Sequence, residues 1–79
     1  MVITLNNFSI HHIASELSRV ANMKLLDKYL PDENFPWVTI EYTKSYLLNK
    51  FVLLSNNSTI EQTYDYHLLL DEFMRTLNI

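Results

Sequence analysis

Apolar residues in the first third of the chain recur with the period of a helix. Between Ser9 and Tyr29 they return every three or four positions, as one buried face of an α-helix requires. Ser9 is a residue type favoured at helix N-caps, and Pro31 ends the pattern. The spacing predicts a helix over residues 9–29, preceded by a short strand or irregular arm at residues 2–5. The apolar positions of this helix are Ile10, Ile13, Ala14, Leu17, Val20, Ala21 and Leu25.

The middle segment, residues 37–54, lies between two turn signals at residues 31–36 and 55–58. Its opening motif WVTIEYT alternates like a strand, but the segment has no internal turn signal and is too long for one ordinary strand. We therefore favour a helix over this segment. The alternative is a β-hairpin that turns near residues 43–45. The apolar positions that share one face of the favoured helix are Trp37, Ile40, Leu47, Leu48, Phe51 and Leu54.

The last segment carries a helix-start motif at residues 58–61. Ser58-Thr59-Ile60-Glu61 matches the capping box, in which Ser bonds the N3 amide and Glu reaches back to the cap. The motif predicts a helix that begins at Ser58. Its apolar face consists of Tyr66, Leu69, Leu70, Phe73 and Leu77.

These segments predict a mainly α fold, a small three-helix domain that takes in residues 1–79 as one unit. The alternative is an α+β fold with a central hairpin between two helices. A chain of 79 residues buries only about 60% of the surface that its unfolded form exposes. It has no cysteine to form disulfides, yet 48% of its residues are hydrophobic and 13% are aromatic. This apolar surplus predicts a homodimer.

The charge of the chain argues against nucleic acid as a partner. The net charge is −3, and the six basic residues are spread along the sequence rather than gathered on one face. No stretch approaches the ~20 apolar residues of a membrane span, and residues 1–10 lack the pattern of a secretion signal. We therefore expect a cytoplasmic protein with neither nucleic-acid nor membrane partners. A small DNA-binding regulator built on three helices remains the alternative.

The titratable residues show no catalytic pattern. His11 and His12 are adjacent, so on a helix they point about 100° apart and are badly placed to share one metal ion. His67 follows Asp65 by two residues, but there is no nucleophile motif or Gly-rich loop near them. We expect no catalytic, cofactor or metal site. A small metal-dependent enzyme that uses these histidines or the acids near Asp65 is the less favoured alternative.

Acidic and tyrosine side chains form the candidate docking surface. In a helix that begins at Ser58, three acids lie within about 40° of one another and form a stripe, with a tyrosine beside it. Two further tyrosines share one face of the middle helix. Tyrosine is enriched at protein interfaces because it buries a large area and keeps a polar group. The residues predicted to bind a partner are Glu61, Tyr64, Asp65, Glu72, Tyr42 and Tyr46.

The chain resembles, in type, the small proteins that phages make to disable host defences, including those that act against the BREX system. The resemblance rests on short length, mild acidity, surplus aromatics and AT-rich amino-acid usage. Phe, Tyr, Met, Ile, Asn and Lys total 30 residues, against six for Gly, Ala, Arg and Pro. It implies a non-catalytic inhibitor or adaptor that binds a host protein, such as a subunit of a defence system, in the host cytoplasm.

Overall fold

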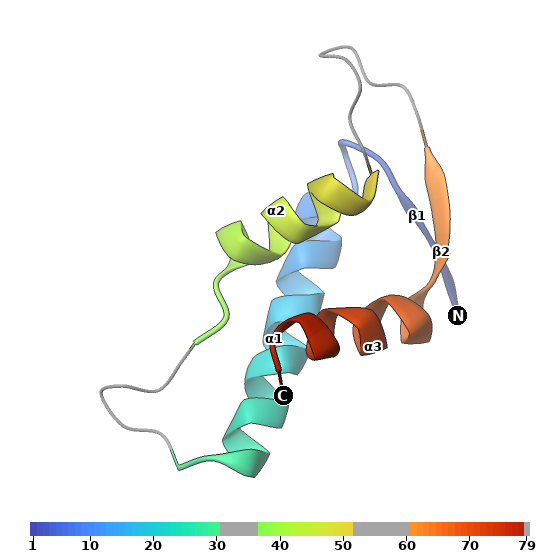
Figure 1. Cartoon of the computed structure of the whole chain (residues 1–79). Coiled ribbons are helices and arrows are strands. Elements are labelled where there is room, and N and C mark those ends of the chain that lie inside the picture. Colours follow the sequence, from blue (N-terminus) through green and yellow to red (C-terminus); the bar gives the residue numbers. More distant parts are fainter. Residues whose placement is uncertain (31–36, 52–60, 79) are drawn as a thin grey trace.

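The computed structural model describes residues 1–30, 37–51 and 61–78. These residues form three helices and a two-stranded antiparallel sheet (Figure 1). The mainly α, three-helix fold predicted from the sequence is therefore confirmed, with a small sheet added to it. In chain order the elements are β1 Val2–Leu5, α1 Ile10–Lys28, α2 Ile40–Phe51, β2 Gln62–Asp65 and α3 Tyr66–Thr76.

The turn between β1 and α1 is built on asparagine, because the chain has no glycine. The side-chain Oδ1 of Asn6 accepts hydrogen bonds from the backbone amides of Phe8 and Ser9, both at 2.9 Å. This asparagine turn replaces the glycine turn that many proteins use. Ser9 takes the N-cap position as predicted, but its hydroxyl donates to the Thr4 carbonyl at 2.8 Å instead of capping the helix. Ser9 therefore ties α1 back to β1.

Helix α2 confirms the helical interpretation of the middle segment, and the hairpin alternative is wrong. The hydroxyl of Thr39 accepts a hydrogen bond from the Tyr42 amide at 3.1 Å, which satisfies one of the free amides of the first turn. Leu47 and Phe51 are fully buried, as the pattern predicted. Trp37 lies before the helix and is exposed.

The predicted start of the last helix is wrong. Residues 62–65 form strand β2, which pairs with β1 so that Val2 lies opposite Asp65 and Leu5 opposite Gln62. Helix α3 begins only at Tyr66, and Asp65 is its N-cap. The capping-box prediction used local sequence alone, whereas β2 is held by a strand some 60 residues away in the chain. Residues 58–60 of that motif lie outside the described residues.

The core lies where the three helices and the inner face of the sheet meet. Helices α2 and α3 each cross α1, and the sheet lies beside the C-terminal end of α2 and the N-terminal end of α3 (Figure 1). Among the described residues, no helix is long and apolar enough to cross a membrane. The buried apolar side chains are Leu5, Ile10, Ala14, Leu17, Ala21, Leu25, Val38, Leu47, Phe51, Tyr66, Leu69, Phe73 and Met74.

Candidate functional site

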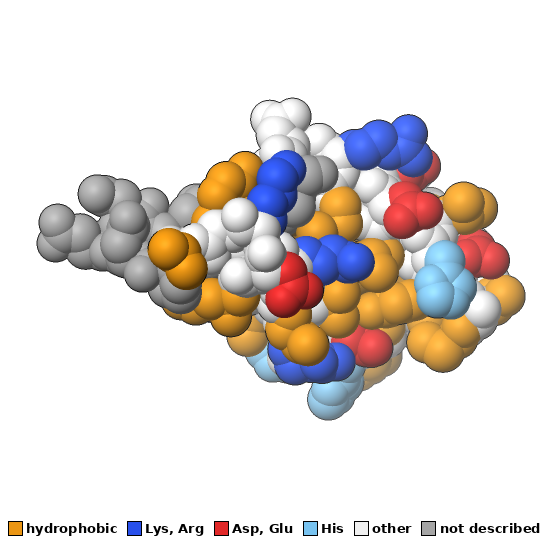
Figure 2. Space-filling view, turned by 90° about the horizontal axis from the view of Figure 1, so that it is seen from below, with side chains coloured by type: hydrophobic (Ala, Val, Ile, Leu, Met, Phe, Trp, Pro, Cys, Tyr) orange, Lys and Arg blue, Asp and Glu red, His pale blue; other side chains and the backbone are white. Residues whose placement is uncertain are grey.

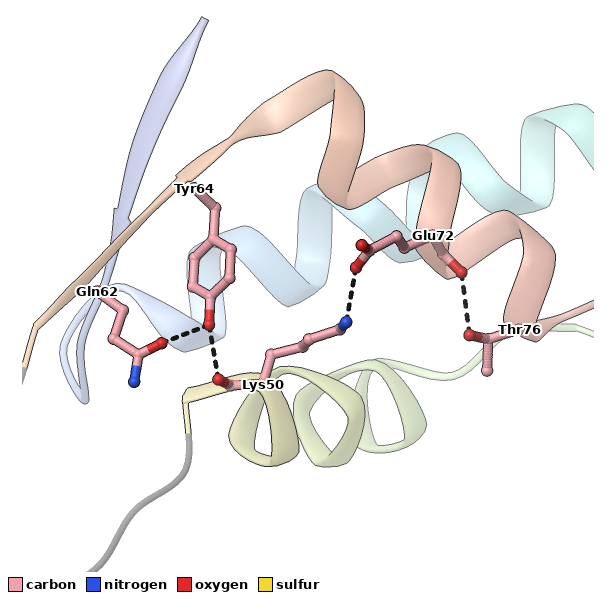
Figure 3. A network of polar contacts seen from close by, with 5 residues as sticks. All are labelled: Lys50, Gln62, Tyr64, Glu72 and Thr76. Atoms are coloured by element: carbon pink, nitrogen blue, oxygen red, sulfur yellow. Dashed lines mark hydrogen bonds and ion pairs between the residues drawn. The ribbon is translucent and has the colours of Figure 1, made fainter.

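Four of the six predicted partner-binding residues gather where α2, β2 and α3 meet. We call this group the Lys50 junction: Tyr42, Tyr46, Lys50, Tyr64 and Glu72. Its centre is an ion pair between Lys50 Nζ and Glu72 Oε2 at 2.6 Å (Figure 3). The Tyr64 hydroxyl lies 2.6 Å from the carbonyl oxygen of Lys50 and joins β2 to the end of α2. The junction therefore links the three elements through polar contacts.

The Lys50–Glu72 pair changes the pKa of both side chains. The hydrogen bond from Lys50 lowers the pKa of the Glu72 carboxyl, and the same bond raises the pKa of the Lys50 ammonium. The two side chains are 35% and 47% exposed, so solvent screens their attraction. Pairs of this kind contribute about 0.2–1 kcal/mol to stability. The pair joins α2 to α3 without supplying much of the folding free energy.

The two tyrosines of α2 face α3. The rings of Tyr42 and Tyr46 lie 6.3 and 4.9 Å from the ring of Phe73, measured between centroids. Tyr46 is half-buried, and burial raises the pKa of its hydroxyl. Among the described residues, this buried hydroxyl has no hydrogen-bond partner. Tyr42 is 47% exposed, so of the two only Tyr42 offers a large surface to another molecule.

The predicted acidic stripe does not form. Glu61 and Asp65 are not helical: Glu61 accepts a bond from the Asn6 side chain at 3.3 Å, and Asp65 caps α3. Asp65 Oδ1 accepts the amides of His67 and Leu68 at 2.9 and 3.2 Å. Because the helix begins at Tyr66, the three acids have no common helical face.

Tyr64 also differs from the prediction of an exposed aromatic anchor. It is half-buried on the inner face of β2, and its hydroxyl lies 2.6 Å from Gln62 Oε1 as well as from the Lys50 carbonyl. These contacts hold the ring within the fold. The partner-binding role of the six residues stays a prediction. All six also make contacts within the chain, through ring packing on Phe73 for Tyr42 and Tyr46 and through hydrogen bonds or an ion pair for the rest: Glu61, Tyr64, Asp65 and Glu72.

The histidines lie apart from any cluster of metal ligands. His11 and His12 are both exposed, with ring centroids 6.1 Å apart and the rings edge to face. His67 lies against Tyr66 at 5.8 Å. In the part of the chain that the structure describes, no group of three His, Asp or Glu side chains is placed to hold a metal ion.

A second surface, absent from the sequence-based predictions, lies at the C-terminal end of α1. Five large side chains are exposed there, and we call them the apolar patch. Figure 2 looks onto this end of α1 from below and shows hydrophobic side chains among Lys, Arg, Asp and Glu side chains. The exposed fractions are Met23 54%, Leu26 42%, Tyr29 46%, Leu30 90% and Trp37 55%.

Asn22 fixes Trp37 beside this end of α1. Its side-chain Oδ1 accepts the Val38 amide at 2.8 Å, and its Nδ2 donates to the Val38 carbonyl at 3.1 Å. The amide side chain therefore pairs with the backbone of Val38 as a neighbouring strand would. Since Trp37 precedes Val38 directly, this pairing adds an aromatic ring to the exposed side chains of α1.

A signal for the patch was present in the sequence. Met23, Leu26 and Leu30 follow the i, i+3, i+7 spacing of a helical face. In the structure Met23 and Leu26 lie on the opposite side of α1 from the buried Ala21 and Leu25, while Leu30 follows two residues after the end of the helix. A helix with two apolar faces, only one of them used by the core, indicates a second contact surface.

Comparison of the chain with protein-family models, with curated proteins and with solved structures finds no match.

Proposed function

We propose that this chain is a non-catalytic protein-binding domain that acts by occupying the surface of another protein. The observation that carries the proposal is the apolar patch. Large apolar side chains are usually scattered singly over a monomer surface, whereas contiguous exposed patches mark interaction sites. Here Met23 and Leu26 lie on one face of α1, and three more exposed side chains follow beyond its end: Tyr29, Leu30 and Trp37.

The residue types of the patch suit an interface that a partner covers. Trp and Tyr are enriched among the side chains that supply most of the binding energy, and Met adapts to irregular surfaces. Full burial of a large apolar side chain is worth about 1.5–3 kcal/mol. The pairing of Asn22 with Val38 fixes the backbone next to Trp37, which lowers the entropy cost of burying that residue against a partner.

The test is affinity capture with variants of the patch. Leu26→Gln and Trp37→Gln remove apolar surface from exposed positions, so they should leave the fold intact and reduce the captured protein at least tenfold. Phe8→Ser is the matched control, because Phe8 is 92% exposed but lies before the other end of α1. Along the helix Leu26 lies about 24 Å from Ile10, the first residue of α1, so it is far from Phe8. Equal capture by all variants would refute the proposal.

We propose further that the chain is a phage-encoded inhibitor and that its partner is a host protein. The target of the inhibitor is then a subunit of a defence system such as BREX. This finer proposal is supported by the resemblance in size, charge and amino-acid usage. Its test is phage plating on bacteria that carry a BREX system, with and without expression of the chain. Expression should raise plating efficiency, and Leu26→Gln should abolish that rise. Unchanged plating would refute the defence target while leaving the binding function to the capture experiment.

A further inference from the structure

Positively charged side chains lie beside the apolar patch. The Arg19 guanidinium lies 3.5 Å from the sulfur of Met23, and the Lys28 ammonium lies 5.6 Å from the centre of the Tyr29 ring. Two cations therefore lie directly on patch side chains. Over residues 19–30 the chain has three cations and one acid, Asp27, although its net charge is −3. Residues 31–36, which include two acids, lie outside the described residues.

We propose that the apolar patch binds an acidic amphipathic helix of the partner protein. The inference rests on the proposed function and names the chemistry of the surface that the patch recognises. Met23 and Leu26, spaced i and i+3 on α1, form a short ridge of the kind that packs into the groove of another helix. Carboxylates flanking an apolar stripe on the partner would meet Arg19 and Lys28, while the stripe itself covers Leu26 and Trp37. Complementary charge of this kind steers association and sets partner choice.

A second copy of the chain fits this surface poorly. Two patches placed face to face would oppose the cations of one copy with those of the other, and like charges across an interface are unfavourable. The most acidic helix of the chain, α3, has a single exposed large apolar side chain, Leu68. Its apolar face is buried in its own core. Charge and shape therefore both favour a different protein.

An anionic membrane surface is the other chemistry that attracts a basic apolar helix face. On α1 the exposed apolar face consists only of Met23 and Leu26, about one turn, and the acid Asp27 follows Leu26 directly. Membrane-surface helices bury a long apolar face with basic residues along both sides. The short stripe and the acid favour a protein helix.

The chain contains its own reporter for the test, because Trp37 is its one tryptophan and belongs to the patch. Two tryptophan-free 18-residue helical peptides share an apolar stripe of leucines and differ only in having Glu or Lys at the other positions. The acidic peptide should shift the Trp37 emission to shorter wavelength and bind at least tenfold more tightly than the basic one. Its affinity should fall as salt is added. Phosphatidylglycerol vesicles form the third arm.

Two charge reversals at equivalent helix positions provide the matched control. Lys28 and Arg75 are the basic residues in the last turns of α1 and α3, so both interact with a helix dipole in the same way. Lys28→Glu should weaken binding of the acidic peptide about tenfold, within the range of close charge pairs at interfaces. Arg75→Glu should change it less than twofold. Circular dichroism of both variants checks that the helices remain.

Each outcome decides the inference. Preference for the acidic peptide together with loss on Lys28→Glu supports it. Equal or tighter binding of the basic peptide, equal effects of the two reversals, or an emission shift with vesicles and with neither peptide would overturn it. The proposed function is judged separately by capture with Leu26→Gln. If that variant loses its partner while the peptides are not distinguished by charge, the binding function stands and only the partner chemistry is wrong.

Discussion

Substitution of Asn22 by alanine tests whether one side chain holds the segment before α2 against α1. The change removes the bond from the Val38 amide at 2.8 Å and the bond to the Val38 carbonyl at 3.1 Å. Val38 is buried, so its amide and carbonyl lose their partner at a site that water reaches poorly. The expected result is lower stability and a more mobile Trp37.

The size of the effect follows from the two bonds. A buried backbone group left without a partner costs about 1–3 kcal/mol. Because Asn22 is half-buried, water partly replaces it, and the lower half of that range applies to each group. Alanine regains about 0.5 kcal/mol through its higher helix propensity. The net loss should be about 2 kcal/mol, a large part of the roughly 4–12 kcal/mol expected for a domain of this length.

Urea denaturation followed by circular dichroism measures the loss, and the anisotropy of Trp37 fluorescence measures the local mobility. Asn49→Ala is the control, because Asn49 is an exposed asparagine in the last turn of another helix, α2. It gains the same helix propensity and should unfold at the same or slightly higher urea concentration than the wild type. If Asn22→Ala and Asn49→Ala unfold at the same midpoint, the pairing with Val38 does not hold the segment.

Four further predictions concern the Lys50 junction, the core and the assembly state. Tyr46→Phe should stabilise the fold by about 1 kcal/mol, because it removes a buried hydroxyl that has no partner among the described residues. Tyr64→Phe should destabilise the fold by a similar amount, because it removes the bond to the Lys50 carbonyl. Urea denaturation that gives the opposite signs would contradict both. The pKa of Glu72 is lowered in the fold, so its contribution to stability is present above the unfolded pKa of about 4.3 and is lost as pH falls through the folded value. The difference in unfolding free energy between wild type and Glu72→Gln should therefore vanish in acid, and a difference that persists at pH ~2 would count against the pair. Phe73→Ala should cost about 3–5 kcal/mol, measured by thermal unfolding, and a loss under ~1 kcal/mol would exclude a central position in the core. Light scattering at micromolar concentration should give about twice the 9.4 kDa chain mass, and a monomer mass would refute the dimer. Leu26→Gln should keep the dimer mass, because like charges prevent the patch from pairing with itself. A monomeric variant would show instead that the patch is the dimer interface.

The helices of the first two segments could be predicted because their signals are local. The buried positions of α1 repeat every three or four residues from Ile10 to Leu25, and the predicted bounds differ from the observed ones by one residue. The middle segment was ambiguous because its first residues are rich in β-branched side chains, but Leu47 and Phe51 identify the helical face.

The last segment could not be predicted in the same way, because its structure depends on residues far away. In isolation, residues 58–61 resemble a helix start, and nothing nearby shows that residues 62–65 pair with residues 2–5. The candidate docking site shifted for that reason: a strand at 62–65 places Tyr64 inward and makes Asp65 a cap. The apolar patch was missed because an exposed stripe and a buried stripe look alike in a hydrophobic pattern.

The pairing of β1 with β2 has a consequence for how the chain folds during synthesis. Val2 meets its partner only after Asp65 has been made, and ribosomes add about 5–20 residues per second. From the end of α1 at Lys28 to Asp65 this takes roughly two to seven seconds, while a helix forms in about a microsecond. Closing the loop that runs from Val2 to Asp65 costs about 4 kcal/mol in chain entropy, plus a constant. For some seconds the nascent chain therefore has Leu5 and the core face of α1 exposed. In this interval chaperones or a partner protein first contact these side chains.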